Sequence, residues 1–193
     1  MATAKRDLLL ETAERLFYAE GFHATGIDRI VQAAGVVRMT LYNHFPSKNA
    51  LVAAVLERRH TRFLAAIDAA VAKAPDGRTT WALVDAHGKW LRTSGQHGCF
   101  LMKAAGEFAE HAPEIRDQAL AAKQDLRQRI ADTLARDGYR TDDGLAERLH
   151  LVLEGANASV PLHGARATLR HARATVERLL DGQSEPEPTA SDT

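Results

Sequence analysis

The sequence predicts an all-α fold, and three observations support this. Apolar residues recur at spacings of three and four along the chain, as on one face of a helix with 3.6 residues per turn. No stretch alternates apolar and polar residues like a half-buried strand. Several of the periodic segments end at a glycine or a proline. With 193 residues, the chain can bury a core as one or two small domains.

Three short helices and the start of a long one are expected in the first sixty residues. Gly21, Gly35 and Pro46 should end the three short helices. Thr25 and Ser47 stand where side chains cap the second and fourth helices. The inward positions are Leu9, Ala13, Leu16 and Phe17; Ile27, Ile30, Val31 and Ala34; Leu41 and Phe45; and Leu51, Val52, Val55 and Leu56.

Five further helices should follow. Their segments are TTWALVDAHGKWLRTS, CFLMKAAGEFA, a long helix between Pro113 and Gly138, DDGLAERLHLVLEGANASV and ATLRHARATVERLL. Residues 181–193 hold four acids and no large apolar side chain, which predicts a disordered acidic tail.

The second and third short helices have the spacing of a helix-turn-helix unit, whose second helix enters the major groove of DNA. With Leu41 and Phe45 turned inward, steps of about 100° per residue point Met39 and Asn43 outward. Thr40 and Tyr42 then lie on the flanks, and Arg38 and His44 near the edges of the buried stripe. This outward set combines base-edge donors and acceptors with phosphate-reaching groups and one apolar contact. A helix that faced only solvent would carry more Glu, Lys and Gln.

The stretch GIDRIVQAAGVVRMTLYNHFPSKNALVAAVLE resembles the amino-terminal domain of the TetR-type transcriptional regulators, and the match extends over about residues 7–57. The resemblance implies an all-α homodimer. Residues 1–48 would form an amino-terminal three-helix helix-turn-helix DNA-binding domain, and residues 49–180 a carboxy-terminal helical effector and dimerisation bundle.

The resemblance also implies the contacts with double-stranded operator DNA. Thr40, Tyr42 and His44 would contact phosphates and base edges, and Lys48 a phosphate at the start of the fourth helix, where backbone N–H groups also favour an anion. Gly26 replaces the hydroxyl residue often found there in the family, so Thr25 would have to supply that contact. Val37 stands where the family usually has Ser or Ala, and its side chain cannot cap the recognition helix. The full predicted DNA-contacting set is Thr25, Arg38, Met39, Thr40, Tyr42, Asn43, His44 and Lys48.

The second region should hold a site for a small, mostly apolar effector, because cavities of helical bundles are lined by apolar groups with a few polar anchors. Each aromatic side chain could equally be ordinary core. The candidate lining residues are Phe63, Trp81, Trp90, Met102, Glu107, Phe108 and Asn157.

The last two helices would form the dimer interface, as in one subgroup of the family. The candidates are Leu169, Ala172, Val176 and Leu179 as an apolar stripe, and Gly155, Ala156 and Ala158 as small residues that admit a partner helix. Alternatively, these positions pack within the monomer.

Charge and composition exclude several function classes. The 25 basic and 25 acidic residues cancel, yet residues 1–62 hold nine Lys and Arg against six Asp and Glu, a mildly basic head. No segment approaches the roughly 18 apolar residues of a membrane span, and a single cysteine excludes an internal disulfide, so we expect a cytoplasmic protein that does not bind membranes. No spacing typical of a metal site, a cofactor site or an enzyme motif is present.

Together these features favour a repressor that is released from a near-palindromic operator by its effector. Two alternatives stay open. The head could bind protein as a helical adaptor, or Cys99, at a helix start, could act as a thiol sensor, although a structural cysteine is the plainer interpretation.

Overall fold

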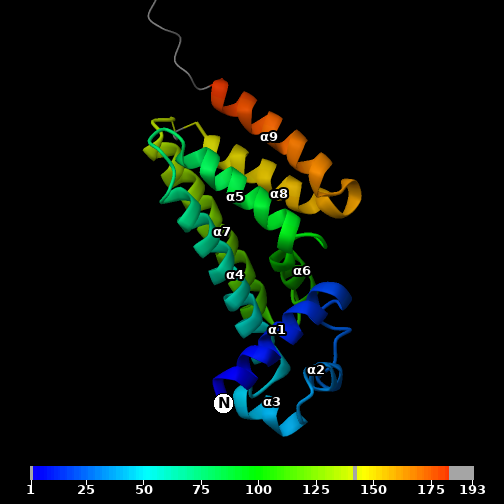
Figure 1. The fold of residues 1–193 in the computed structure, drawn as a ribbon. Coiled ribbons are helices and arrows are strands. Elements are labelled where there is room, and N and C mark those ends of the chain that lie inside the picture. The colour runs from blue at the N-terminus through cyan, green and yellow to red at the C-terminus, as the bar shows by residue number, and fades with distance from the viewer. Residues whose placement is uncertain (1, 141–142, 183–193) are drawn as a thin grey trace, which may run out of the picture. The chain divides into compact units, whose positions relative to one another are not determined.

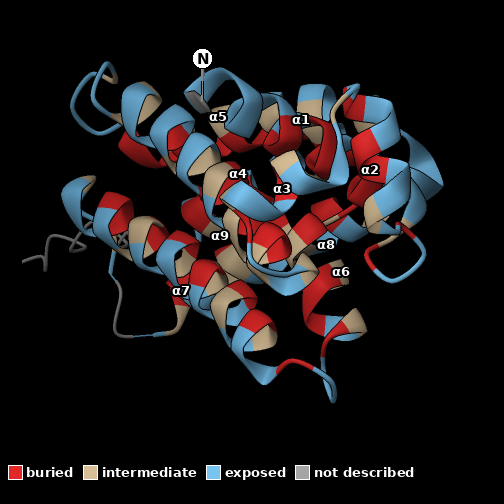
Figure 2. Ribbon diagram, turned by 90° about the horizontal axis from the view of Figure 1, so that it is seen from below, coloured by how far each residue is buried: buried red, intermediate tan, exposed pale blue. Residues whose placement is uncertain are grey.

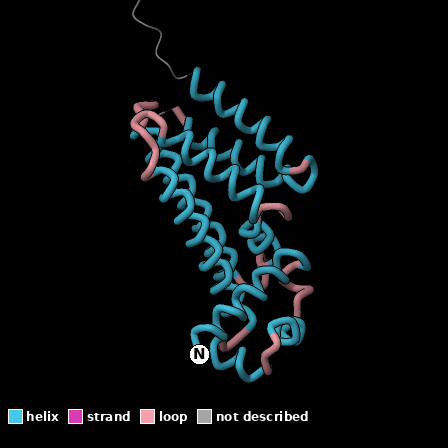
Figure 3. The backbone as a smooth tube through the Cα atoms, in the orientation of Figure 1, coloured by secondary structure: helices cyan, strands magenta, loops and turns pink. Residues whose placement is uncertain are grey.

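The computed structural model describes residues 2–140 and 143–182, and these residues form helices joined by loops (Figure 3). The helices are α1 (Ala2–Glu20), α2 (Ile27–Ala34), α3 (Arg38–His44), α4 (Lys48–Val71), α5 (Thr79–Ser94), α6 (Phe100–Glu107), α7 (Pro113–Arg136), α8 (Leu145–His163) and α9 (Ala165–Asp181) (Figure 1). The all-α prediction is confirmed. Apart from Asp181 and Gly182, the predicted acidic tail lies outside the described residues.

Two compact units divide the chain, and each is described by itself. The first comprises Met1–Ala66 and His97–Asp125, and the second Ile67–Gln96 and Leu126–Thr193. α6 and the first half of α7 therefore share a unit with the helix-turn-helix. The sequence predicts a division by function, with a DNA-binding domain at 1–48 and an effector domain at 49–180. That division differs from the two compact units and stays a prediction.

The core of the first unit combines buried aliphatic side chains with a cluster of aromatic rings. Phe22 lies at its centre, with ring centroids 5.2 Å from Phe17, 4.9 Å from Phe100 and 5.7 Å from Phe108. α1, α2 and α3 pack against one another around buried aliphatic side chains of the same core. Each of these helices has one buried and one exposed side (Figure 2), as the spacing of apolar residues predicts.

The second unit is built on aliphatic and small residues. α5, α8 and α9 pack side by side (Figure 1), with Leu91, Ala156 and Val160 buried between them. α8 extends through Pro161 to His163, beyond the end expected from the sequence. Asp137 holds the start of α5, accepting hydrogen bonds from the backbone N–H groups of Thr79 at 2.9 Å and Thr80 at 2.7 Å.

Candidate DNA-reading surface and effector region

The turn between α2 and α3 is fixed by Gly35. Its φ of 65° lies in the left-handed region that glycine favours, and the N–H of Val36 donates to the carbonyl of Val31 at 3.0 Å. Leu41, which is wholly buried, and Phe45, which is 3% exposed, then anchor α3 to the core. The remaining faces of α3 are therefore held in a fixed orientation.

The outward face of α3 carries the side chains expected from the sequence. Met39 is 68% and Tyr42 is 42% exposed. Asn43 is also exposed, while Thr40 and His44 are half-buried. An exposed thioether, phenol and amide on one short helix offer an apolar contact, a phosphate contact and a base-edge contact.

Arg38, at the start of α3, is already engaged by an acid. Its guanidinium pairs with the carboxylate of Asp28 on α2 at 2.9 Å, and both side chains are exposed, at 58% and 78%. A pair that exposed is weak, so a phosphate or a guanine can displace the aspartate at little cost. The pair holds Arg38 at the edge of the α3 surface in the DNA-free chain.

Thr25 does not have the role expected from the sequence. Gly26 occupies the N-cap position of α2 and no side chain caps that helix. The Thr25 hydroxyl instead donates to the carbonyl of Gly21 at 2.7 Å, and the residue is fully buried. The cap prediction is wrong because α2 begins at Ile27, which puts Gly26 and not Thr25 at the N-cap position. We therefore remove Thr25 from the candidate DNA contacts.

Ser47 does cap α4, because its hydroxyl accepts a hydrogen bond from the N–H of Ala50 at 3.0 Å. Lys48 follows at the first position of the helix. Its ammonium donates to the carbonyl of His23 at 3.3 Å, which places the charge beside the α1–α2 turn. Burial lowers the pKa of Lys48, and the negative charge of Glu107 acts in the opposite direction.

Glu107 holds the α1–α2 turn. Its carboxylate accepts hydrogen bonds from the N–H groups of Phe22 at 3.1 Å and His23 at 2.8 Å. The Nε2 of His23 lies 2.6 Å from the Glu107 carbonyl oxygen, and since a carbonyl only accepts, that nitrogen carries the proton. The prediction that Glu107 anchors an effector is not supported, because its carboxylate is engaged inside the first unit.

A buried ion pair joins α1 to α4. The Arg59 guanidinium lies 2.8 Å from the Glu14 carboxylate, and the two side chains are only 9% and 11% exposed. Arg62 adds a second pair to Glu14 at 3.0 Å. Arg59 also lies over the ring of Tyr18, 4.5 Å from its centroid, and the Tyr18 hydroxyl donates to the carbonyl of Gly98 at 2.6 Å. α1 is thus tied both to α4 and to the start of α6.

The other effector candidates of the first unit have different surroundings from those expected. Phe108 is 2% exposed and belongs to the aromatic core around Phe22, whereas Met102 is 49% exposed on the surface of α6. Phe63 is half-buried on α4. The structure does not gather these three side chains around any of the four cavities described within the units.

In the second unit, Trp81 is covered by arginines rather than open to a cavity. The guanidinium of Arg173 lies 4.5 Å, and that of Arg78 6.0 Å, from its ring. Asn157 is buried, and its amide approaches His87 Nε2 and the Glu154 carboxylate at 3.3 Å each. These contacts give both residues a structural role that the sequence pattern did not reveal.

Trp90, the last effector candidate, is half-buried on α5. Like Trp81 and Asn157, it is absent from the lining of the cavities described within this unit. The effector set predicted from the sequence therefore stays a prediction as a whole.

The predicted dimer residues fall into two groups. Val176 is fully buried and Ala156 is 4% exposed, so both pack within the chain and leave no surface for a partner. Leu169 and Ala172 are partly buried against the same small core, and Leu179 is also half-buried. Only Gly155 and Ala158 of the predicted set are exposed.

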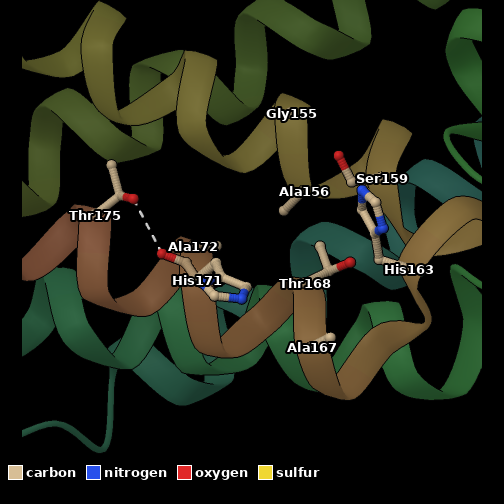
Figure 4. A pocket seen from close by; sticks show the side chains of 9 residues that line it. All are labelled: Gly155, Ala156, Ser159, His163, Ala167, Thr168, His171, Ala172 and Thr175. Atoms are coloured by element: carbon tan, nitrogen blue, oxygen red, sulfur yellow. Dashed lines mark hydrogen bonds between the residues drawn. The ribbon is translucent and has the colours of Figure 1, made fainter.

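Sequence reasoning missed the flanking residues of that exposed face. Leu151 is 70% and Leu162 is 76% exposed, and with Gly155 and Ala158 they form a stripe along α8 at spacings of four, three and four. Beside this stripe, small and polar side chains of α8 and α9 line a groove of about 520 Å³ (Figure 4). Periodicity at positions 151, 155, 158 and 162 could have found the stripe.

Val37 is an exposed residue beside α3 that the predicted DNA-contacting set does not include. It occupies the N-cap position of α3 without any side-chain cap, and it is 69% exposed. Val37 therefore presents an exposed apolar side chain directly before the first residue of α3. A bulky apolar residue at a position that normally requires a capping hydroxyl was the available signal.

Within residues 2–140 and 143–182 there is no group of three or more His, Cys, Asp or Glu side chains that could hold a metal ion. Over the same ranges, no helix combines the length and apolar character required to cross a membrane. Cys99 is a half-buried free thiol at the N-cap of α6.

Comparisons with known proteins agree with this architecture. Residues 9–55 match the family model for bacterial regulatory proteins of the tetR family, and residues 78–176 match that for a tetracyclin repressor-like C-terminal domain. The chain is 30% identical over 187 residues to the HTH-type transcriptional activator FasR of Mycolicibacterium smegmatis, covering 96% of this chain and 79% of FasR.

Two solved structures share the fold. A TetR-family transcriptional regulator from Streptomyces coelicolor is 31% identical, with a TM-score of 0.88 and coverage of 95% of this chain and 97% of that one. A regulator from Saccharomonospora viridis, solved in complex with choline, is 26% identical, with a TM-score of 0.77 and coverage of 91% and 96%. The chain therefore belongs to the TetR family of bacterial transcriptional regulators, a family of DNA-binding proteins and not of enzymes.

Proposed function

We propose that this protein is a ligand-responsive repressor that binds a near-palindromic operator as a homodimer and acts in the cytoplasm. The observation that carries the proposal is the outward face of α3, where Met39, Tyr42 and Asn43 are exposed on a helix anchored by Leu41 and Phe45. Two such helices, one from each protomer, would enter successive major grooves about 34–36 Å apart.

Different side chains of the surface should supply different parts of the binding free energy. Asn43 can donate and accept with the edge of an adenine, while Met39 and Val37 suit a thymine methyl group. Tyr42, Thr40 and His44 would contact the backbone. Arg38 would add a base or phosphate contact after leaving Asp28.

Lys48 should add a phosphate contact at the N-terminus of α4. Backbone N–H groups at a helix start favour an anion, and the ammonium of Lys48 donates to a neutral carbonyl, that of His23. A phosphate is the stronger partner, so DNA binding would exchange one acceptor for the other.

The exposed stripe of α8 supports the homodimer. Leu151 and Leu162 are among the large apolar side chains most exposed in the described ranges, and Gly155 and Ala158 between them allow a helix to approach closely. The groove beside the stripe adds further surface that a partner's side chains can fill (Figure 4). A two-fold arrangement would pair this face of α8 and α9 with the same face of a second copy.

The effector would be a small molecule that prefers a conformation with a different spacing of the two reading heads. It can weaken DNA binding only by its differential affinity for the two states. The regulator from Saccharomonospora viridis, in complex with choline, shows that a neighbour of this fold binds a small organic molecule. FasR is named an activator, so the sign of regulation needs its own measurement.

Selection of random duplex DNA by the purified protein, followed by titration of the selected sequence across salt concentrations, tests the proposal. We expect a palindromic sequence whose affinity falls steeply with salt. Asn43→Ala should cost about 1–3 kcal/mol and relax the preference at one base pair of each half-site. Tyr42→Ala should weaken binding to all sequences. Enrichment of no sequence, or binding that does not depend on salt, would contradict a DNA reader and favour the protein-binding adaptor.

The dimer is tested by Leu151→Glu combined with Leu162→Glu. Placing two carboxylates on the stripe should yield monomers by analytical ultracentrifugation and abolish tight binding to a palindrome while leaving weak binding to a half-site. Leu120→Glu on α7 is the matched control, because Leu120 is 42% exposed outside the α8–α9 face. A dimer that survives the double substitution would place the interface elsewhere.

A further inference from the structure

A cavity of about 290 Å³ lies between α5, α8 and α9 in the second unit. Its walls include Val84, Leu153, Ala156 and Leu169, which are apolar, and its volume is close to the lower limit of about 300 Å³ for small-molecule sites. Gly88 contributes a wall without a side chain, where an added Cβ would come within 3.4 Å of Leu169. The walls thus offer room and contact for a compact apolar group.

The rim of this cavity is cationic. Arg92 from α5 and Arg170 and Arg173 from α9 line it together with a single acid, Asp85, which pairs with Arg173. Three guanidinium groups against one carboxylate leave a surplus of two positive charges, in a chain whose net charge is zero. The aliphatic stems of the three arginines can add apolar contact to the walls, and their guanidinium groups supply the positive charge.

Two of these arginines have no acidic partner among the residues that the structure describes. The Arg170 guanidinium lies 3.3 Å from Nε2 of the His171 ring, which carries no negative charge. Arg92 lies beside Gly88, with Nη1 3.9 Å from the position that a Cβ there would occupy. Both guanidinium groups belong to residues that line one largely apolar cavity, so both are available to an anionic head group there.

We propose that this cavity binds a small organic anion, with a carboxylate or phosphate head held by Arg92 and Arg170 and a short alkyl or aryl part inserted between α5, α8 and α9. The buried end of the cavity supports an ordered wall, because His87 is 1% exposed and is held by the amide of Asn157 at 3.3 Å. The proposal goes beyond the repressor function, since it concerns a site on the free chain and does not require DNA.

Isothermal titration calorimetry of the full chain without DNA tests the site. The probes are octanoate, octyl phosphate, octylammonium and inorganic phosphate, each below its micellar concentration. We expect octanoate or octyl phosphate to bind, which also identifies the preferred head group, and octylammonium and inorganic phosphate to bind at least ten-fold more weakly.

The variant Arg92→Gln with Arg170→Gln should weaken binding of the anion at least ten-fold. Arg166→Gln with Arg178→Gln is the matched control, because it removes two exposed arginines of α9 that do not line the cavity. Equal loss in both variants would show general charge attraction and overturn the proposal. Equal binding of octylammonium, or no binding of either organic anion, would overturn it as well. Because DNA is absent, failure of the repressor proposal leaves these results unaffected.

Discussion

The two compact units solve the same packing problem with different side chains. All six phenylalanines lie in the first unit, where rings stack around Phe22 and the buried Glu14–Arg59 pair joins α1 to α4. Both tryptophans lie in the second unit, on half-buried positions, and its core is aliphatic. Rings and one buried charged pair characterise the packing of the first unit, and small aliphatic residues that of the second. Both units carry surface hollows, of about 510 Å³ beside α1 and α4 and about 520 Å³ beside α8 and α9.

This contrast fits a division of labour. A reading surface has to present Met39, Tyr42 and Asn43 in one geometry, which a rigid aromatic core provides. The second unit carries the α8–α9 face and the cavity proposed for a partner and a small molecule. Four substitutions test how far the contrast holds.

The largest effect is expected from Phe22→Ala. Removing a fully buried ring that contacts three other rings should lower the free energy of unfolding by about 3–5 kcal/mol. Trp81→Ala in the second unit is the counterpart and should cost about 1 kcal/mol, because that ring is half-buried under arginines. Chemical denaturation measures both. Equal costs would remove the proposed difference between the two cores.

Arg59→Met should have the next largest effect, about 3 kcal/mol, because it leaves the Glu14 carboxylate buried with only the half-exposed Arg62 as partner. Arg62→Met serves as the control and should cost less than about 1 kcal/mol, since its side chain is 48% exposed. If the two variants were equally stable, the buried pair would not be a main link between α1 and α4.

Glu107→Gln should lower stability by about 2 kcal/mol, because an amide cannot accept both backbone N–H groups of the α1–α2 turn as a carboxylate does. The turn also carries the carbonyl that holds Lys48, so affinity for operator DNA should fall as well. Titration of labelled operator measures this loss. Glu110→Gln, at an exposed position three residues further along, should change neither quantity. Unchanged DNA affinity in Glu107→Gln would separate the turn from DNA reading.

The smallest effect, about 1 kcal/mol, is expected from Asp137→Asn at the start of α5. Burial raises the pKa of Asp137. Hydrogen bonds from the Thr80 N–H and from the hydroxyl and N–H of Thr79 lower the pKa by more than burial raises it, so it lies below its usual value. The stabilisation is therefore complete above the unfolded pKa of about 3.9 and is lost as the pH falls through the folded pKa.

The stability difference between wild type and Asp137→Asn should accordingly be constant from about pH 7 to pH 5 and narrow below about pH 4. Denaturation at several pH values measures it. Asp132→Asn, at an exposed position of α7, is the control. A difference that widened on acidification would contradict the direction assigned to the pKa shift.

Local signals predicted much of the fold. The segment TTWALVDAHGKWLRTS coincides with α5, and Ser47 caps α4 as expected, because both depend on residues close in sequence. The outward face of α3 also follows from helical geometry once Leu41 and Phe45 are assigned to the core.

The predictions that were wrong or incomplete concern residues whose contacts depend on the tertiary structure and not on the local sequence. Glu107 binds backbone groups 84 and 85 residues away, which no periodicity reveals. Thr25 would stand at the N-cap only if α2 began one residue earlier, and its hydroxyl instead donates to the carbonyl of Gly21. Val176 and Leu151 are both apolar residues of amphipathic helices, and packing of α5, α8 and α9 decides which of them remains exposed.

The attachment of Glu107 to the α1–α2 turn has a practical consequence for engineered regulators. A chimera that joins residues 1–48 to the body of another regulator would cut the chain before α6 and leave the N–H groups of Phe22 and His23 without their carboxylate. Such a chimera would have to include α6 together with residues 1–48, or place another acidic side chain where the Glu107 carboxylate lies. Portability of the operator specificity of this protein thus depends on a residue nearly sixty positions beyond the end of the helix-turn-helix.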